Sequence, residues 1–499
     1  MKLLYCFTAV ALLLALLALL ACNGEDDLIT DSSAQLEFSR DTLTFDTVFT
    51  QLGSATRILK VYNPHSQPIR IDRIYVASGS QSKFRFNVDG ESSNDVRDIE
   101  IRAQDSLYIF GEVTVDPDQD VSISPFVIND ALQFETNGNE QTIVLEAWGQ
   151  NANYFPSRFS NDSITAFSCG GAQLVWDDPK PYVIYGIVFF DECELVIPAG
   201  AEIYVHGGLG SFFDEDGNRL LYNDGRIVIG PNASIRIEGT VDNPVTIQGD
   251  RLEEFFDEVP GQWYGLILSP ESRNNVIEHA VIKNAVVGVV VDSLARLDIR
   301  NTQIYNTTAN ALFGRHASIQ ATNCLFRDNS ANSVRVSQGG DYNFDYCTLA
   351  TFGTDASALS LSNVRCLDPF CQEFFDNDLN ARFRNCIITG SQSDQITLAD
   401  LSDAVAFNYT FEHCIVRVEE LLEDDAYPNF LTDDCNTCIN NTNRESSLFL
   451  DIDEGDYHLD TLSIAEGQAI PLPGITTDLD LVDRDEQVPD IGCYEYVYE

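Results

Sequence analysis

The segment Phe383-Arg384-Asn385-Cys386-Ile387-Ile388 decides the fold, because related segments recur along the second half of the chain. Five others align with it, at residues 277–284, 299–306, 321–328, 344–349 and 411–416. The anchor position of Cys386 is taken in these by Ala280, Thr302, Cys324, Cys347 and Cys414. The successive anchor spacings are 22, 22, 23, 39 and 28 residues. A period near 22 residues with two or three short strands per repeat is typical of a parallel β-helix.

The alignment also predicts which side chains fill the interior. The residue before each anchor is expected to turn a sharp corner in the left-handed conformation that Asn tolerates. These corner residues are His279, Asn301, Asn323, Tyr346, Asn385 and His413. Two strands meet at each corner, and alternation along them points Phe383 and Ile388 inward, together with their equivalents in the other repeats. The anchor cysteines are then small core residues in a buried stack rather than redox or metal groups.

Other cysteines lie in loop-like sequence around this pattern. Cys366 and Cys371 fall within the longest repeat interval, which predicts an inserted loop closed by a local disulfide. Cys435 and Cys438 form a second close pair, and a disulfide is favoured over zinc because zinc normally needs four ligands. The candidates for a third pair, whose connectivity the sequence leaves open, are Cys169 and Cys193.

The repeat region resembles right-handed parallel β-helix proteins of the pectin-lyase-like type. The strand-rich stretch from Leu195 to Ile267 is similar to their customary opening. The run from Gly455 to Glu495 is similar to the closing segment of many secreted bacterial β-helix proteins, except that Leu481 replaces a usual Gly and Cys493 a usual Ala. The resemblance implies an all-β fold with a right-handed parallel β-helix over residues 169–430 and its closing segment over 431–499.

The resemblance also implies polysaccharide lyases and hydrolases, whose carboxylates, or basic residue with calcium ligands, stand on the outer face of one sheet. The matching outward row consists of Val290, Phe313, Arg335, Ser360 and Thr397. No carboxylate occurs in that row, whereas glycoside hydrolysis needs two carboxyl groups at a defined separation. We therefore predict no catalytic residue and expect the β-helix to bind a glycan or a protein partner.

A polysaccharide lyase or glycoside hydrolase is the alternative. It requires carboxylates and a basic group to converge around Arg335, Arg315 and His316. A structural role in the envelope without any ligand also stays open. No metal site is predicted, but calcium remains open as a cofactor, because Asp214 to Asn218 is rich in oxygen ligands without the full spacing of a known calcium loop.

Lys283, Tyr305 and Arg327 follow a second line along the coils and are further candidates for ligand binding. The alternative is that the two cations are ion-pair partners on an acidic protein. Beside this line runs an apolar stripe that is predicted to face outward and consists of Val281, Leu325, Ile387 and Ile415. Monomers rarely leave such a stripe bare. We expect the loop near Cys371 or the acidic segment from Glu419 to Asp425 to cover it, with a partner surface as the alternative.

Residues 34–152 alternate apolar and polar residues in short runs, which predicts a β-sandwich. The expected strands are 58–62, 69–74, 84–88, 107–110 and 142–145, with turn chemistry at Asn63-Pro64-His65-Ser66. The stretch from Gly53 to Ile71 resembles immunoglobulin-like domains of the ASH/Hydin type, which implies a spacer or docking module. A linker is expected over 153–168.

The N-terminal sequence predicts where the protein is located. An apolar run from Leu3 ends in Leu19-Leu20-Ala21-Cys22, which resembles bacterial lipoprotein signal peptides. That resemblance implies a signal peptide over residues 1–21, a lipid anchor on Cys22 and a tether over 22–33. The acidic residues after Cys22 resemble the surface-export signal of Bacteroidetes-type lipoproteins, which implies the outer membrane, facing the exterior. An uncleaved membrane helix from Leu3 to Ala21 is the alternative.

Composition limits the partners. The chain has 78 acidic against 29 basic residues and a formal net charge of −49. Such a surface repels nucleic acid and polyanionic polysaccharide, except where a local basic patch acts within the Debye length of about 8 Å. Hydrophobic residues make up 44% and aromatic residues 10% of the chain, which is ample for packed cores. The expected partners are a membrane through the lipid anchor and a polysaccharide or surface protein.

Overall fold

A computed structural model describes residues 28–49, 54, 56–114, 126–155, 164–213, 219–252, 254–424, 427–442 and 448–497. The chain forms two compact units, 1–151 and 152–499, and each is described by itself. Apart from helix α2 (Glu254–Asp257) and short 3₁₀ or π segments, the regular structure of the described residues is β-strand. None of the helices described there is long and apolar enough to cross a bilayer. The predicted anchor Cys22 and the segment from Asp214 to Asn218 lie outside the described residues.

The first unit is a sandwich of two five-stranded sheets, with the orders β1-β3-β8-β5-β6 and β2-β10-β9-β4-β7. Alternate residues of both sheets fill one core, in which Phe45, Phe84 and Phe134 are among the largest fully buried side chains. The strands are β1 (Glu37–Phe38), β2 (Thr42–Phe49), β3 (Arg57–Tyr62), β4 (Ile69–Val76), β5 (Phe84–Val88), β6 (Glu91–Ser92), β7 (Asp95–Ile101), β8 (Ser106–Val113), β9 (Phe126–Thr136) and β10 (Asn139–Gln150).

The five strands that alternation predicted in this unit are present as β3, β4, β5, β8 and β10. The predicted turn after β3 is held by the buried Asn63, whose amide donates to the carbonyls of Gln67, Ile101 and Arg102 at 2.8, 3.2 and 2.9 Å. One side chain thus ties two loops together. Kinship with ASH/Hydin-type immunoglobulin-like domains remains a prediction.

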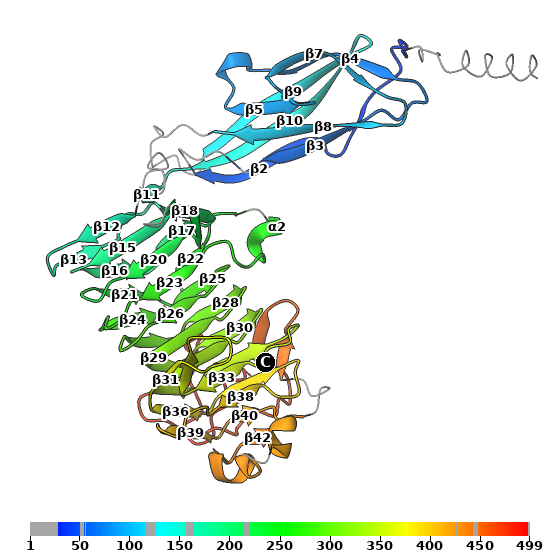
Figure 1. Cartoon of the computed structure of the whole chain (residues 1–499). Helices are drawn as coiled ribbons and strands as arrows, with labels where there is room; N and C mark the ends of the chain where they lie inside the picture. The colour runs from blue at the N-terminus through cyan, green and yellow to red at the C-terminus, as the bar shows by residue number, and fades with distance from the viewer. Residues whose placement is uncertain are drawn as a thin grey trace, which may run out of the picture. The chain divides into compact units, whose positions relative to one another are not determined.

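The second unit is a parallel β-helix, whose strands stack coil upon coil in Figure 1. Successive coils pair in register, so Ile277 lies beside Ile299 and Ile282 beside Ile304, 22 residues later. One strand position of the coil forms an 11-strand sheet: β11 (Asn153–Phe155), β14 (Tyr182–Tyr185), β17 (Glu202–His206), β22 (Val245–Gly249), β25 (Ala280–Lys283), β28 (Gln303–Thr307), β30 (Leu325–Asn329), β32 (Thr348–Thr351), β37 (Ile387–Gly390), β40 (Ile415–Val416) and β42 (Ile439–Asn440).

The other two strand positions of the coil form a 17-strand sheet. In β29 and β31 the two positions merge into one long bent strand. The strands are β12 (Thr165–Ser168), β13 (Gln173–Val175), β15 (Ile187–Asp191), β16 (Glu194–Pro198), β20 (Arg226–Ile229), β21 (Ser234–Glu238), β23 (Gly265–Leu268), β24 (Asn275–Glu278), β26 (Val289–Val291), β27 (Arg296–Arg300), β29 (Leu312–Thr322), β31 (Val334–Asp345), β33 (Leu359–Ser362), β36 (Leu379–Arg384), β38 (Ile396–Ala399), β39 (Phe407–Glu412) and β41 (Cys435–Asn436).

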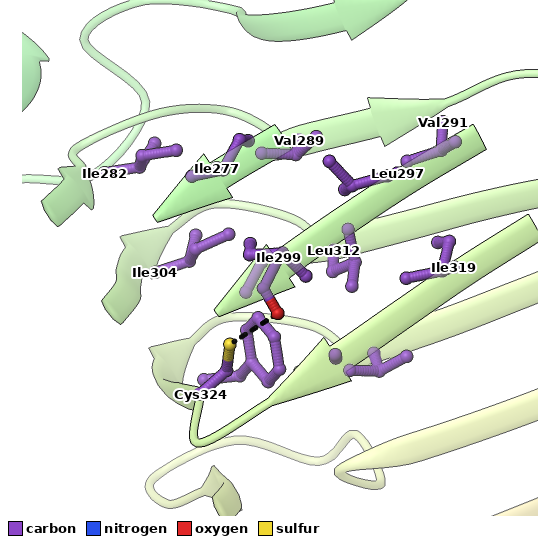
Figure 2. Close-up of a cluster of buried hydrophobic side chains, with 14 of the residues drawn as sticks. Ile277, Ile282, Val289, Val291, Leu297, Ile299, Ile304, Leu312, Ile319 and Cys324 are labelled. Carbon is purple, nitrogen blue, oxygen red and sulfur yellow. Dashed lines mark hydrogen bonds between the residues drawn. The ribbon is translucent and has the colours of Figure 1, made fainter. Parts of the chain in front are cut away.

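The interior of the β-helix consists of ladders of apolar side chains. Figure 2 shows Ile277 and Ile299 in one such ladder and Ile282 and Ile304 in the next. In later coils the ladder of Ile277 continues in aromatic rings, and Phe383 stacks on Phe344 and Phe411 with ring centroids 5.0 Å apart. Every side chain that the alignment predicted to point inward is buried. Burying each of these larger side chains contributes about 1.5–3 kcal/mol to folding.

The predicted corners are also confirmed. All six residues that precede an anchor adopt the left-handed conformation, with φ between 46° and 55°. They are His279, Asn301, Asn323, Tyr346, Asn385 and His413. Each sharp turn places the strand before the corner in the 17-strand sheet and the strand after it in the 11-strand sheet.

The segment 153–168, expected to be a linker, already contributes strands. β11 pairs in parallel with β14, and β12 with β15. These strands form because the apolar side chains at the N-terminal end of the β-helix core need to be covered. Phe155 stacks on Trp176 at 5.5 Å and meets the edge of Phe167 at 5.4 Å, so these strands close the end of the core.

The apolar stripe on the 11-strand sheet is covered by neither of the segments we expected. Leu325, Ile387 and Ile415 are buried beneath residues 448–496, here called the C-terminal cover, while Val281 is only half-buried. The cover contains the hairpin of β43 (Phe449–Asp451) and β44 (Asp456–Leu459). The cover has apolar side chains of its own, so packing it against the stripe removes both apolar surfaces from water.

Candidate functional site

The outer face of the 17-strand sheet carries two parallel rows of polar side chains. One row runs across Ser318, Asp341, Asn380 and Asn408, which are aligned by strand register. The second row, two residues further along each strand, runs across Gln320, Asn343, Arg382 and Thr410. Adjacent strands are about 4.8 Å apart, so each row presents a polar group at every step along the β-helix.

Asp341, Asn380 and Asn408 form a hydrogen-bonded ladder. The amide of Asn408 donates to Oδ1 of Asn380 at 3.0 Å, and the amide of Asn380 donates to Oδ1 of Asp341 at 3.0 Å. Each amide keeps a further N–H and a further lone pair. All three side chains are exposed, so these groups are open to a ligand with hydroxyl groups.

The second row is oriented by ion pairs at its edge. Arg384 makes two hydrogen bonds to the buried Asp345, at 2.7 and 2.8 Å, and Asn343 donates to the same carboxylate at 2.9 Å. Oδ1 of Asn343 then accepts from Nε of Arg382 at 2.7 Å. This chain of hydrogen bonds orients Arg382, which is exposed.

Between the rows lies an open depression of about 340 Å³, here called the polar groove. Its buried floor is formed by Tyr342 and Ala381. Its rim consists of Gln320, Asp341, Asn343, Asn380, Arg382, Asn408, Tyr409 and Thr410. At one end the hydroxyl of Tyr409 donates to Asp434 at 3.2 Å. Burial raises the pKa of Tyr409, so its phenol stays protonated and remains a donor.

The structure places the first group of sequence-predicted candidates on the same sheet, outside the polar groove. Phe313 is half-buried beside the exposed Arg335. Arg315 is paired with Asp292, whose Oδ1 lies 2.7 Å from its Nε. His316 is a left-handed corner residue with φ of 46°. Within this group the structure brings Phe313 and Arg335 side by side on neighbouring strands, and it holds the carboxylate of Asp292 in an ion pair with Arg315.

The second group of candidates does lie together. Lys283, Tyr305 and Arg327 occupy three successive strands of the 11-strand sheet in register. Arg327 stacks on Tyr305 with its guanidinium 3.9 Å from the ring centroid and pairs with Asp328, while Lys283 pairs with Asp257. Both cations are thus engaged in ion pairs, as the alternative interpretation expected.

The three candidate disulfides are present, as Cys169–Cys193, Cys366–Cys371 and Cys435–Cys438. The anchor cysteines Cys324, Cys347, Cys386 and Cys414 are free and buried in the core. Burial raises the pKa of the Cys347 and Cys414 thiols, which keeps them protonated and unreactive. Among the described residues, no cluster of three or more His, Cys, Asp or Glu side chains could hold a metal ion.

Our sequence reasoning missed the polar groove, although the repeat alignment contains the signal for it. The first row stands six residues before each anchor, and the second stands four residues before. In the coils ending at Cys324, Cys347, Cys386 and Cys414 these positions carry polar residues throughout. Outward polar positions are ordinary in a sheet, so only their hydrogen bonding and the depression between them distinguish the site.

The chain matches no family model and no curated protein. Among solved structures, the Agl-KA catalytic domain is similar over 72% of this chain and 79% of its own, with 12% identity and a TM-score of 0.22. A GH87 α-1,3-glucanase from Streptomyces thermodiastaticus covers 72% of each chain, with 11% identity and a TM-score of 0.21. A Porphyromonas gingivalis protein of unknown function shares 14% identity over 28% of this chain, with a TM-score of 0.16; the match spans 59% of that protein. Likenesses at such identities and TM-scores do not identify a function.

Proposed function

We propose that this protein is a glycan-binding lipoprotein of the outer membrane and that glycan chains bind in the polar groove without being cleaved. The hydrogen-bonded ladder of Asp341, Asn380 and Asn408 is the observation that carries this proposal. Sugars present many hydroxyl groups that both donate and accept. Carboxylate, amide and guanidinium groups on one rigid surface complement them without adjusting the backbone.

The groups around the groove favour binding over hydrolysis. Among the described residues that line it, Asp341 is the one carboxylate. Three neighbouring carboxylates are engaged: Asp298 pairs with Arg300, Asp345 pairs with Arg384, and Asp434 accepts a hydrogen bond from the hydroxyl of Tyr409 at the end of the groove. Hydrolysis on the usual plan needs a second carboxyl group about 5–9.5 Å from the first that is available as acid, base or nucleophile.

The membrane part of the proposal is supported by the sequence around Cys22 alone. A lipid chain on that cysteine would hold the protein at a bilayer, and stable attachment takes more than one chain. The strongly acidic composition keeps the exposed surface soluble and disfavours polyanionic ligands.

Affinity electrophoresis of the purified protein tests the binding proposal. Native gels would contain dextran, mannan or xylan as neutral polysaccharides, or polygalacturonate as an anionic one. We expect at least one neutral polysaccharide to retard the protein, and we expect the double variant Asn380→Ala/Asn408→Ala to migrate as in a gel without polysaccharide. The matched control is Asn232→Ala, an exposed asparagine on an earlier coil.

Release of reducing ends or unsaturated products from the same polysaccharides would overturn the binding proposal and establish the enzymatic alternative. Unretarded migration on every polysaccharide would overturn glycan binding and leave a protein partner or a structural role in the envelope.

A further inference from the structure

An exposed aromatic hairpin interrupts the β-helix between β33 and β36. It consists of β34 (Val364–Cys366), β35 (Phe374–Asp376) and the loop between them, and it is here called the aromatic hairpin. Four of its large apolar side chains are exposed by 41% to 83%. They are Leu367, Phe370, Phe374 and Phe375. A cluster of large apolar side chains with this much exposed surface marks an interaction site.

The loop of the hairpin is held by one disulfide and by hydrogen bonds to a side chain. The disulfide between Cys366 and Cys371 closes it. The carboxylate of Asp368 accepts hydrogen bonds from the backbone N–H groups of Phe370 and Glu373, at 2.8 and 2.6 Å. A surface held in place before binding loses less conformational entropy when a ligand arrives. The exposed rings are therefore arranged in advance.

The base of the hairpin is fastened beside the polar groove. The backbone N–H of Gly340, next to the groove residue Asp341, donates to the carbonyl of Asp378 at 2.8 Å. Ser402 donates to Asp376 at 2.6 Å and fixes the end of β35. Phe375 and the groove residue Asn380 are five residues apart, so their Cα atoms are at most about 17 Å apart.

We infer that the aromatic hairpin and the polar groove bind the same ligand and that this ligand is an uncharged polysaccharide; the inference rests on the proposed function. The groove supplies hydrogen bonds to hydroxyl groups, and the phenylalanine rings supply flat surfaces for the apolar faces of sugar rings. Between residues 364 and 378, four acidic residues accompany one basic residue. That local charge, on a chain of net charge −49, repels an anionic polymer and leaves a neutral one unaffected.

Affinity electrophoresis with dextran, mannan, xylan and polygalacturonate separates the two parts of the site. For Phe374→Ala/Phe375→Ala we expect binding to the retarding neutral polysaccharide to weaken about tenfold, because the stacking surface on either face of β35 is lost. Phe374→Tyr/Phe375→Tyr keeps the rings and should bind as the unmodified protein does. Phe255→Ala removes an exposed ring outside the proposed site, 78% exposed on α2, and should not change binding. Unfolding midpoints establish that each variant is folded.

The possible outcomes distinguish this inference from the proposed function. If Phe374→Ala/Phe375→Ala binds normally while Asn380→Ala/Asn408→Ala does not, the inference about the hairpin is wrong and the proposed glycan binding in the groove is retained. If both variants bind normally, the proposed site is wrong as well. Retardation by polygalacturonate as strong as by any neutral polysaccharide would overturn the assignment to an uncharged ligand. If no polysaccharide retards the unmodified protein, both the inference and the proposed function are overturned.

Discussion

On the 11-strand sheet, the position after the anchors Cys324, Cys386 and Cys414 carries Leu325, Ile387 and Ile415, and the C-terminal cover buries all three. On the 17-strand sheet, the position six residues before the same anchors carries Ser318, Asn380 or Asn408, and the two asparagines are exposed. The same coil therefore presents an apolar outer face that folding must cover and a polar outer face that stays open. In a β-helix the offset from the anchor decides whether an outward residue serves folding or binding.

The largest effect is expected when the side chain that attaches the C-terminal cover to the β-helix is removed. The side chain of Arg484 is 2% exposed, pairs with Glu495 at 3.1 Å and donates to Asn323 of the β-helix at 3.1 Å. Arg484→Ala leaves the buried Glu495 without its cation, so we expect the free energy of unfolding to fall by about 3–5 kcal/mol. Urea unfolding measures the change. Arg273→Ala, on an exposed arginine, is the control and should change stability by less than about 0.5 kcal/mol.

The next prediction concerns a side chain of the covered apolar face itself. Ile387 is fully buried between the β-helix and the cover. Ile387→Ala removes buried methyl groups and leaves a cavity, so we expect a loss of about 2–5 kcal/mol. Leu401→Ala, at an exposed leucine, is the comparison and should be close to neutral. Equal effects of the two substitutions would mean that the cover does not bury this face in solution.

The charge of His458 provides a milder test of the cover. His458 bonds to Asp480 at 2.8 Å and to Asp456 at 2.6 Å, and these bonds, Asp480 first, raise its pKa to about 9. A raised pKa stabilises the folded protein fully below the unfolded value of about 6.5, and this contribution is lost as pH rises through about 9. Because the side chain is 43% exposed, solvent reduces the effect.

We expect His458→Gln to unfold at a lower urea concentration than the unmodified protein near pH 6 and to lose this difference by about pH 10. Urea midpoints measured across that range test the prediction. A difference that is the same at both ends would show that the imidazolium does not stabilise the cover.

The smallest expected effect on stability is on the open face. Asn380→Ala removes an exposed side chain and should change the free energy of unfolding by less than about 0.5 kcal/mol while weakening polysaccharide retention. Asn385 is the matched counterpart on the covered face, since its buried amide exchanges two hydrogen bonds with Ile470 at 2.8 and 3.1 Å. Asn385→Ala should cost about 1–3 kcal/mol and leave retention unchanged. The opposite result for either asparagine would contradict the division between the two faces.

Much of the β-helix was predictable because its signal is periodic. Aligning six segments on Cys386 was sufficient to identify the interior ladder of Phe383, the corner at Asn385 and the buried stack of anchor cysteines. The polar groove was present in the same alignment but looked like any solvated row. Its ladder depends on the register between strands, which brings Asp341 and Asn380 together across 39 residues of sequence.

The sequence by itself determined what repeats or is local: the coil, its inward residues, its corners and the two close disulfides, because each depends on near neighbours or on one fixed period. The tertiary structure decided what lies across the coils. It brought residues 448–496 onto the stripe of Leu325 and Ile387, which no local pattern links to them, and it set the aromatic hairpin beside the groove. Any apolar segment can cover an apolar face, so hydrophobic burial alone does not determine which segment packs there. Specific polar contacts, such as those of Arg484 with Asn323 and Glu495, determine it.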